Sequence, residues 1–297
     1  MIWGGIEGGG SKFVCAVGTG HHDIREEVRF PTTTPEETFR KACHFFDRMI
    51  AKYGSLKGLG IGSFGPVDLN PKSPKYGFIT STPKLAWRGV EFKGFFERRY
   101  GIDVSFDTDV NAAALAEGSW GAAKGLKNYV YLTIGTGVGG GGVVGGRLIH
   151  GLVHPEMGHV IIRRDKEKDP FEGACPFHKD CLEGMAAGPA IEKRWGIPGE
   201  DLSEDHEAWD LEADYIAQGL LPLLYVLSPH KIILGGGVMD QETLFPKVRK
   251  RFIHYLAGYI EHPAVKEGID DYIVPPALGK KAGILGAFAL AMGSYEL

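Results

Sequence analysis

Two glycine-rich stretches, each lying between short apolar segments, limit most strongly what this chain can fold into. The first covers residues 8–10 in the sequence IEGGGSK, and the second covers residues 135–146 and begins GTGVGGGG. Each follows a segment typical of a strand and is followed by another strand rather than a helix. Each stretch therefore predicts a tight hairpin whose backbone can come close to a ligand.

The elements around the first hairpin are expected to recur around the second. In the first half we predict strands at residues 2–6, 13–17, 24–30, 56–61 and 102–106, and helices at 35–53, 90–100 and from 111 onward. In the second half we predict strands at 129–134, 138–144, 147–149, 231–234 and 272–274, and helices at 211–227, 244–259 and 282–292. This repetition predicts an α/β chain of two related lobes with a central cleft, where ligands usually bind.

Composition narrows the function classes. The chain has 297 residues, 43% of them hydrophobic and 24% charged, which is enough to bury a large core. Its net charge of −4, without a block of Lys and Arg, argues against a nucleic-acid partner. A secretory leader and an apolar run of roughly 20 residues are both missing, so we expect no membrane partner and a cytoplasmic location. The four cysteines are then expected as thiols or metal ligands.

The first glycine stretch differs from a P-loop. A P-loop places Gly-Lys-Ser/Thr before a helix, whereas here Ser11 precedes Lys12 and the sequence FVCAVG continues as a strand. The hairpin can still form an anion-binding nest of backbone N–H groups. Gly9 and Gly10 would let a phosphate approach, and Lys12 would add a positive charge.

The second glycine stretch matches G-x-G-x-x-G, but its context differs from a dinucleotide-binding fold. Glu156 even lies about 20 residues further on, as that fingerprint requires. The sequence VVGGRLIHG that follows is typical of a hairpin, not a helix, which argues against this interpretation. Plain turns remain the alternative for each hairpin taken alone. Two hairpins at equivalent places favour phosphate binding, here by Thr133, Gly135, Thr136 and Gly137.

A third glycine group, at Gly235, Gly236 and Gly237, follows the buried segment IIL. The end of a strand in an α/β lobe is a usual ligand position, so this group can accommodate an adenosine against the backbone. A strand-to-helix turn is the plainer alternative.

A cysteine and histidine cluster predicts a metal site. Cys175, His178 and Cys181 form C-x₂-H-x₂-C, and His159 lies upstream. Two thiolates and two imidazoles suit tetrahedral Zn²⁺, and a site with four protein ligands is structural rather than catalytic. Free surface cysteines or a disulfide between the two cysteines are the alternatives, and a reducing cytoplasm argues against the disulfide.

Asp109 is the candidate general base because it follows a predicted strand, where a carboxylate can accept a proton from a hydroxyl group. A helix N-cap formed by Asp109 or Asn111 is the alternative. The residues alone leave both roles open.

Seven motifs, taken in order, resemble the ROK family of bacterial sugar kinases. They are EGGGSK at residues 7–12, GPVD at 65–68, TPKLAW at 82–87, DTDVNAAALAEG at 107–118, GTGVGGG at 135–141, PEMGH at 155–159 and CLEG at 181–184. The resemblance covers nearly the whole chain and is more specific than any one motif. Within the family the chain most resembles bacterial fructokinases, which share the opening GGIEGGG and a shortened cysteine/histidine cluster.

This resemblance implies a duplicated actin-like ATPase (ribonuclease H-like) fold. The smaller lobe would comprise residues 1–118 plus 282–297, and the larger lobe, residues 119–281, would carry the zinc loop. ATP and Mg²⁺ would be cofactors, and the family is commonly dimeric, so a homodimer is expected. Glu7 stands where the family has Asp and is expected to help hold Mg²⁺ through water.

The resemblance also implies residue roles. Asp109 falls on the Asp of the family's Asp-x-Asn position, which implies the general-base role. Adenosine is expected near Pro189 and Gly236. Lys84 stands where the family has Asn and inherits no role. The implied sugar-binding residues are Gly65, Pro83, Thr108, Glu156 and Glu183.

Fructose is the expected substrate, phosphorylated to fructose 6-phosphate. Thr108 replaces the family's sugar-holding Asn, which favours another hexose over glucose. Glucose, mannose and N-acetylhexosamines are the alternatives within the family. A DNA-binding repressor is disfavoured because only six residues precede Glu7, and the retained Asp109 disfavours a non-catalytic sugar-binding regulator.

Overall fold

The computed structural model describes residues 1–293 and divides the chain into two compact units. The first comprises Met1–Leu126, Gly141–Pro155 and the segment from Lys280 onward, and the second comprises Lys127–Gly140 and Glu156–Gly279. The range 282–297 expected in the smaller lobe includes residues 294–297, which lie outside the described residues.

The first sheet has the strand order β3-β2-β1-β4-β5. Its strands are β1 (Ile2–Gly8), β2 (Lys12–Gly20), β3 (Asp23–Pro31), β4 (Leu56–Ser63) and β5 (Val104–Thr108). Strands β1, β2 and β3 form an antiparallel meander, whereas β4 and β5 run parallel to β1. Strand β5 begins and ends two residues later than the predicted range.

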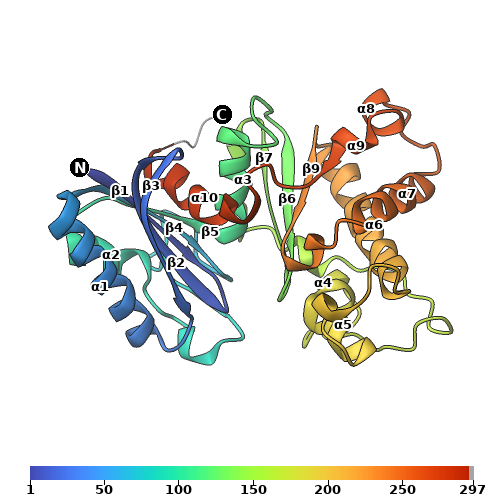
Figure 1. Cartoon of the computed structure of the whole chain (residues 1–297), viewed down its shortest axis with the longest axis horizontal. Coiled ribbons are helices and arrows are strands. Elements are labelled where there is room, and N and C mark those ends of the chain that lie inside the picture. Colours follow the sequence, from blue (N-terminus) through green and yellow to red (C-terminus); the bar gives the residue numbers. More distant parts are fainter. Residues whose placement is uncertain (294–297) are drawn as a thin grey trace. The chain divides into compact units, whose positions relative to one another are not determined.

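Helices of the first unit cover both faces of this sheet, as Figure 1 shows. Helix α1 (Pro35–Tyr53) begins at a Thr34 cap and packs with α2 (Lys93–Tyr100) over an aromatic core that includes Phe39, Phe46 and Phe96. Helix α3 (Asp109–Trp120) and helix α10 (Ala282–Ala291) cover the other face. Helix α2 starts three residues later than predicted.

Small residues let α10 lie unusually close to the sheet. A Cβ atom placed on Gly60 of β4 would lie 1.8 Å from the Ala287 carbonyl oxygen, and one placed on Gly286 would lie 2.1 Å from that of Ala112. Any larger side chain at these positions would push the helix away. The apolar sequence of α10 is therefore explained by burial against β1, β4 and α3.

The second sheet repeats the order of the first. It runs β10-β9-β6-β7-β8, so strands six to ten take the places of strands one to five. The strands are β6 (Tyr129–Ile134), β7 (Val138–Val144), β8 (Arg147–Leu148), β9 (Ile232–Gly235) and β10 (Ile273–Val274). Strand β9 runs parallel to both β6 and β10. The predicted duplication is visible in this shared topology.

The second unit carries two long helices, α6 (Ala208–Leu227) and α7 (Leu244–Leu256), which pack against each other. The shorter helices were not predicted from the sequence. These are α4 (Leu182–Ala186), α5 (Gly188–Trp195), α8 (Pro263–Lys266) and α9 (Ile269–Tyr272). Segments of four to eight residues are too short for helical periodicity to be read from sequence.

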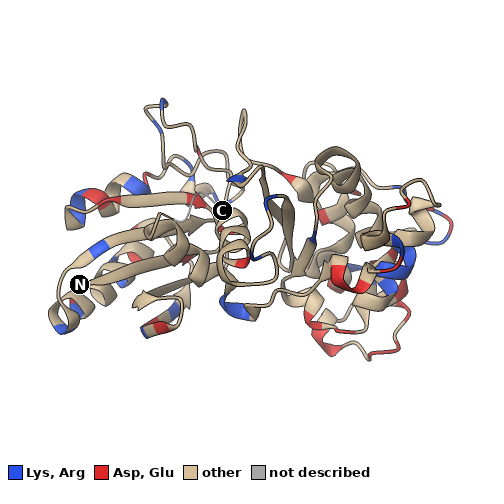
Figure 2. Ribbon diagram, turned by 90° about the horizontal axis from the view of Figure 1, so that it is seen from above, with Lys and Arg blue, Asp and Glu red and all other residues tan. Residues whose placement is uncertain are grey.

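Basic and acidic residues are interspersed along the helices, as the coloured ribbon of Figure 2 shows. Surface ion pairs join Lys41 to Glu37, Arg99 to Asp47 and Lys247 to Asp210. Within residues 1–293, every helix is too short or too polar to cross a lipid bilayer.

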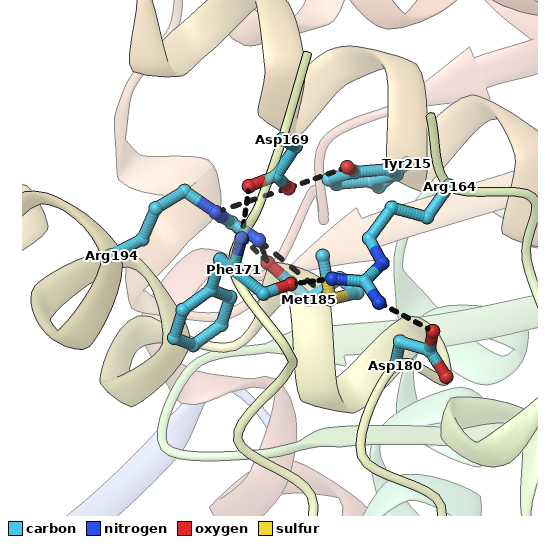
Figure 3. Close-up of polar contacts among 7 residues, drawn as sticks. All are labelled: Arg164, Asp169, Phe171, Asp180, Met185, Arg194 and Tyr215. Carbon is cyan, nitrogen blue, oxygen red and sulfur yellow. Dashed lines mark hydrogen bonds and ion pairs between the residues drawn. The ribbon is translucent and has the colours of Figure 1, made fainter. Parts of the chain in front are cut away.

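A polar cluster lies inside the second unit (Figure 3). The Arg194 guanidinium lies 3.3 Å from the Asp169 carboxylate and donates to the Met185 carbonyl, and the Tyr215 hydroxyl donates to Asp169 at 2.6 Å. Arg164 pairs with Asp180, next to the cysteine and histidine loop, and donates to the Phe171 carbonyl. The cluster therefore ties that loop to α5 and α6.

Glu212 of α6 is buried beside this cluster without a hydrogen-bond partner for either carboxylate oxygen among the described residues. Burial raises the pKa of Glu212 well above its usual value, and the positive charge of Arg194 opposes this only in part. The unfolded chain would ionise near the ordinary pKa while the folded chain keeps the proton. Stability is therefore lost as pH rises above that value.

We expect Glu212→Gln to raise Tm at pH 8 relative to the unaltered protein, because the amide needs no proton to stay neutral. The gain should shrink as the pH falls toward 4.5, where about half of the unfolded chains already carry a protonated glutamate. Thermal unfolding from pH 4.5 to 8 measures this, with Glu192→Gln on the exposed face of α5 as the control. A lower Tm for Glu212→Gln at pH 8 would show instead an ionised Glu212 paired with Arg194.

Candidate functional site

Three parallel strands of the first sheet end side by side. The register pairs Gly8 of β1 with Ser63 of β4, and Ser63 with Thr108 of β5. The segments that follow these ends begin at Gly9, Phe64 and Asp109. Since neighbouring strands lie about 4.8 Å apart, the glycine turn and Asp109 flank the middle strand at a separation of about 10 Å. The carboxyl edge of parallel strands is the usual ligand position in α/β folds.

The first glycine turn is held by Thr32, which follows β3. Its hydroxyl donates to the Gly9 carbonyl at 2.7 Å and its N–H donates to the Ser11 carbonyl at 2.9 Å, while the Gly9 N–H donates to Lys12 at 3.0 Å. Ser11 and Lys12 are exposed at this edge. The hydrogen bonds from Thr32 therefore fix the turn, while its predicted phosphate-binding residues, including Gly10, remain accessible to solvent.

Asp109 is the first residue of α3, and Thr108 caps that helix. The Thr108 hydroxyl oxygen accepts the Asn111 N–H at 3.1 Å. The predicted cap at Asp109 or Asn111 is therefore wrong. Threonine takes the cap because its backbone is extended while the next residue is already helical. Asp109 Oδ1 accepts the N–H of Val110 at 2.9 Å.

A buried carboxylate that the sequence analysis did not single out organises this junction. Asp107 is 2% exposed, and its Oδ1 accepts from the Thr108 N–H at 2.7 Å and from Asn111 Nδ2 at 2.8 Å. Its Oδ2 lies 2.7 Å from His150 Nε2, and this hydrogen bond raises the pKa of His150. Asn111 in turn accepts the Gly142 N–H at 3.2 Å. The Asp-x-Asp spacing of DTD was the only signal in the sequence.

Gly65 lies on the loop after β4 and contacts a second histidine. His154 Nε2 accepts the Val67 N–H at 3.1 Å, and a Cβ atom placed on Gly65 would lie 3.0 Å from the His154 ring. His154 is nearly fully buried. The part of the β4–α2 connection that carries the predicted sugar-binding Gly65 is thus braced by this ring, whereas Pro83 is exposed further along the same connection.

In the second unit the predicted nucleotide-binding glycines converge. The Gly188 N–H donates to the Gly135 carbonyl at 2.7 Å, which brings the start of α5, with Pro189, to the second hairpin turn. Strands β6 and β9 end together, with Thr133 paired to Gly235. Gly236 has φ 93°, which favours glycine, and a Cβ there would meet the Ile134 backbone. Thr136 and Gly137 lie in the turn itself, and Gly237 begins the segment after β9.

The two predicted sugar-binding glutamates lie on different elements of the second unit. Glu183 is in the first turn of α4, and its Oε2 accepts the Val138 N–H at 3.0 Å beside Gly137. Glu156 is exposed and precedes the short helical turn Met157–His159. The N–H of His159 donates to the Glu156 carbonyl. Glu183 is therefore fixed against the second hairpin.

The four predicted metal ligands come together. Their ligand atoms all lie within 4.8 Å of one another. His159 Nδ1 lies 3.6 Å from Cys181 Sγ and 3.9 Å from Cys175 Sγ, and His178 Nδ1 lies 3.8 Å from Cys175 Sγ. Tetrahedral Zn²⁺ with its usual bond lengths separates sulfur and nitrogen ligands by about 3.5 Å. The donor set and its spacing therefore fit zinc.

The local fold explains why these ligands meet. Cys175 pairs its backbone with Lys179, which has φ 58°, and this reverses the chain around His178. Cys181 pairs with Ile161, close to His159 along the chain. Burial raises the pKa of the Cys181 thiol to about 11. A bound metal would offset this, because it takes the thiolate form.

The similarity of this chain to known proteins extends over nearly its whole length. The family model described as "ROK family" matches residues 3–294. A putative fructokinase of Bacillus subtilis is 49% identical over 97% of this chain and 94% of its own length. A fructokinase of Pediococcus pentosaceus is 44% identical over 100% of this chain and 99% of its own. The resemblance to bacterial fructokinases noted in the sequence is thereby confirmed.

Solved structures agree with the fold. A ROK hexokinase from Thermus thermophilus is similar with a TM-score of 0.78 at 29% identity, covering 98% of both chains. A ROK family glucokinase from Streptomyces griseus, solved with glucose and AMPPNP, is similar with a TM-score of 0.79 at 26% identity, covering 99% of this chain and 100% of its own. The predicted duplicated actin-like ATPase fold is confirmed by these similarities and by the repeated sheet order. Sequence, topology and relatives lead to one conclusion: this chain belongs to the ROK family.

Proposed function

We propose that this chain is an ATP-dependent hexose kinase that converts D-fructose to fructose 6-phosphate. The observation that carries the proposal is the alignment of strand ends in the first sheet, which puts a glycine turn suited to phosphate and the Asp109 carboxylate on one edge. Full-length relatives named fructokinase, at 44–49% identity, support the choice of fructose.

The transfer step follows from phosphoryl-transfer chemistry. The oxygen of a primary sugar hydroxyl forms a bond to the γ-phosphorus of ATP. The bond from that phosphorus to the β,γ-bridging oxygen breaks, and ADP leaves with the electron pair. Asp109 accepts the hydroxyl proton. Catalysis of this kind depends mainly on positioning and charge neutralisation.

Asp109 suits the role of general base because its backbone is held on both sides. Thr108 and Asn111 both donate a hydrogen bond to the buried Asp107 carboxylate. The backbone of Asp109, which lies between them in sequence, is therefore held in place. Its place at the start of α3, after a strand end, leaves it half-buried rather than enclosed. A proton acceptor in this role has to lie within hydrogen-bond reach of the hydroxyl.

Glu7 of β1 is the proposed contact for Mg²⁺ in the first unit. Its carboxylate lies against Gly283 of α10, and burial raises its pKa while the positive charge of Lys12 opposes the shift. A carboxylate destabilised by burial gains from a nearby cation. Mg²⁺ would neutralise phosphate charge, held here mainly through water.

In the second unit we assign nucleotide binding to the converging glycines and sugar binding to the two glutamates. Thr133, Gly135, Thr136 and Gly137 are the proposed phosphate contacts. Pro189 and the residues Gly235, Gly236 and Gly237 are the proposed adenosine contacts. Glu156 and Glu183 are the proposed contacts for sugar hydroxyls, as Gly65, Pro83 and Thr108 are in the first unit.

The cluster of His159, Cys175, His178 and Cys181 is the proposed structural zinc site. With four protein ligands, it leaves no coordination position for a substrate or reactive water. Its proposed role is to brace the loop between Glu156 and Glu183. The homodimer and the cytoplasmic location expected from the sequence stay predictions.

A panel of hexoses with Mg·ATP tests the proposed function. We expect fructose to give the highest kcat/KM, mannose to follow, and fructose 6-phosphate to be the product identified by NMR. A higher kcat/KM for glucose or an N-acetylhexosamine would reject fructose as the substrate and indicate another sugar kinase activity of the family. Zero sugar-dependent ADP release, with retained sugar binding, would favour a non-catalytic sugar-binding regulator.

Asp109→Asn should lower kcat by about 10²-fold or more, because the amide cannot accept the hydroxyl proton. The amide oxygen can still accept the Val110 N–H, so the fold is expected to persist. Steady-state kinetics measure the loss, and Asp103→Asn, at an exposed position before β5, is the control. Near-normal turnover of a folded Asp109→Asn protein would remove Asp109 from this role.

Metal analysis of the purified protein should find about one zinc per chain, falling to near zero in Cys181→Ser. The Tm of Cys181→Ser should also fall, because the loop loses the cross-link that the metal provides. Cys43→Ser is the matched control because Cys43 lies outside the cluster on α1. Full zinc content in Cys181→Ser, or no zinc in the unaltered protein, would exclude this site.

A further inference from the structure

Lys84 stands on the loop between β4 and α2, in the segment TPKLAW. The resemblance to the ROK family implies no role for this residue, because the family carries Asn at this position. The structure places its side chain against the first glycine turn. A Cβ atom placed on Gly10 would lie 3.5 Å from Lys84 Cε, which is van der Waals contact.

The backbone of Lys84 is fixed on both sides. Its N–H donates to the Thr82 hydroxyl at 3.4 Å, and its carbonyl accepts the Trp87 N–H at 2.9 Å. Trp87 is 1% exposed, and its indole N–H donates to the Thr33 carbonyl at 2.8 Å. Its ring also lies 5.6 Å from that of Phe13, one residue after Lys12. The loop and the turn are therefore packed into one rigid region.

The charge of Lys84 lacks an anionic partner among residues 1–293. The side chain is half-buried, yet within the described chain no carboxylate lies within ion-pair distance of its ammonium group. By contrast, Lys93 on the following helix pairs with Glu97. A partly desolvated cation without a counter-charge is unfavourable unless a ligand supplies one. In the adjacent turn the Gly9 N–H is bonded to the Lys12 carbonyl, whereas Ser11 is exposed and Gly10 is partly exposed, at the predicted phosphate site.

We propose that Lys84 is a phosphate-binding residue whose ammonium group contacts the terminal phosphate oxygens of the nucleotide held at the Gly9–Lys12 turn. The inference rests on the proposed kinase function. Lys12 and Lys84 would then both supply positive charge at this turn. Lysine suits this role as a compact point charge with three donors. Phosphoryl transfer requires the negative charge of the terminal phosphate to be neutralised.

The test compares the affinities of the unaltered protein, Lys84→Met and Lys84→Arg for ATP, ADP and AMP by titration calorimetry. Lys84→Met should weaken ATP binding about tenfold or more, as expected for a lost charged hydrogen bond. The affinity for ADP should fall by a smaller factor, and the affinity for AMP should not change. Lys84→Arg should keep most of the ATP affinity, and KM for fructose should stay within about twofold in both variants.

Lys72→Met, at an exposed position earlier in the same β4–α2 connection, is the matched control and should bind all three nucleotides normally. Circular dichroism and Tm check that each variant is folded. Equal losses for ATP, ADP and AMP, or unchanged ATP affinity in Lys84→Met, would overturn the inference. So would a change confined to KM for fructose, which would place Lys84 at the sugar.

The two proposals fail differently. ATP binding that weakens in Lys84→Met, together with zero sugar-dependent turnover in the unaltered protein, would retain the phosphate contact and reject the kinase. Normal turnover of fructose with unchanged ATP affinity in Lys84→Met would retain the kinase and reject the contact.

Discussion

The Asp107 carboxylate accepts three hydrogen bonds at the end of β5, and the position of Asp109 depends on them. One comes from the Thr108 N–H, one from Asn111 and one from His150. A buried carboxylate is costly unless it is fully hydrogen-bonded, so these partners are required once Asp107 is placed there. The same bonds fix the strand-to-helix junction, which gives the neighbouring Asp109 a defined direction at the edge of the sheet.

The parallel arrangement of β1, β4 and β5 gives that edge its chemistry. A turn that suits phosphate, a loop predicted to contact sugar and a candidate base all follow strands that end in register. The second sheet repeats the order, and its glycine turns converge in the same manner around Gly135 and Gly188. Duplication thus supplies two edges with the same strand order, each of which carries its own set of side chains.

Buried polar groups are used differently in the two units. In the first, Asp107 and Asn111 are satisfied by hydrogen bonds and organise the junction at the proposed base. In the second, Arg194 and Asp169 connect the loop of the four proposed metal ligands to α5 and α6, while Glu212 beside them is left without a partner among the described residues. The first arrangement positions a functional group, and the second anchors a loop that has little regular structure of its own.

Glycine placement and apolar periodicity determined much of this protein from sequence alone. The duplicated α/β topology, all ten predicted strands and the proximity of His159, Cys175, His178 and Cys181 were predictable because they depend on local signals: turn residues, alternation and ligand type. The cap of α3 was predicted wrongly, since several polar residues at 107–111 could each serve and only the backbone angles decide. The partners of Asp107 and the approach of Lys84 to Gly10 join residues far apart in sequence. Only the tertiary structure decided these contacts, because the packing of Trp87 and the register of β4 and β5 bring those segments together.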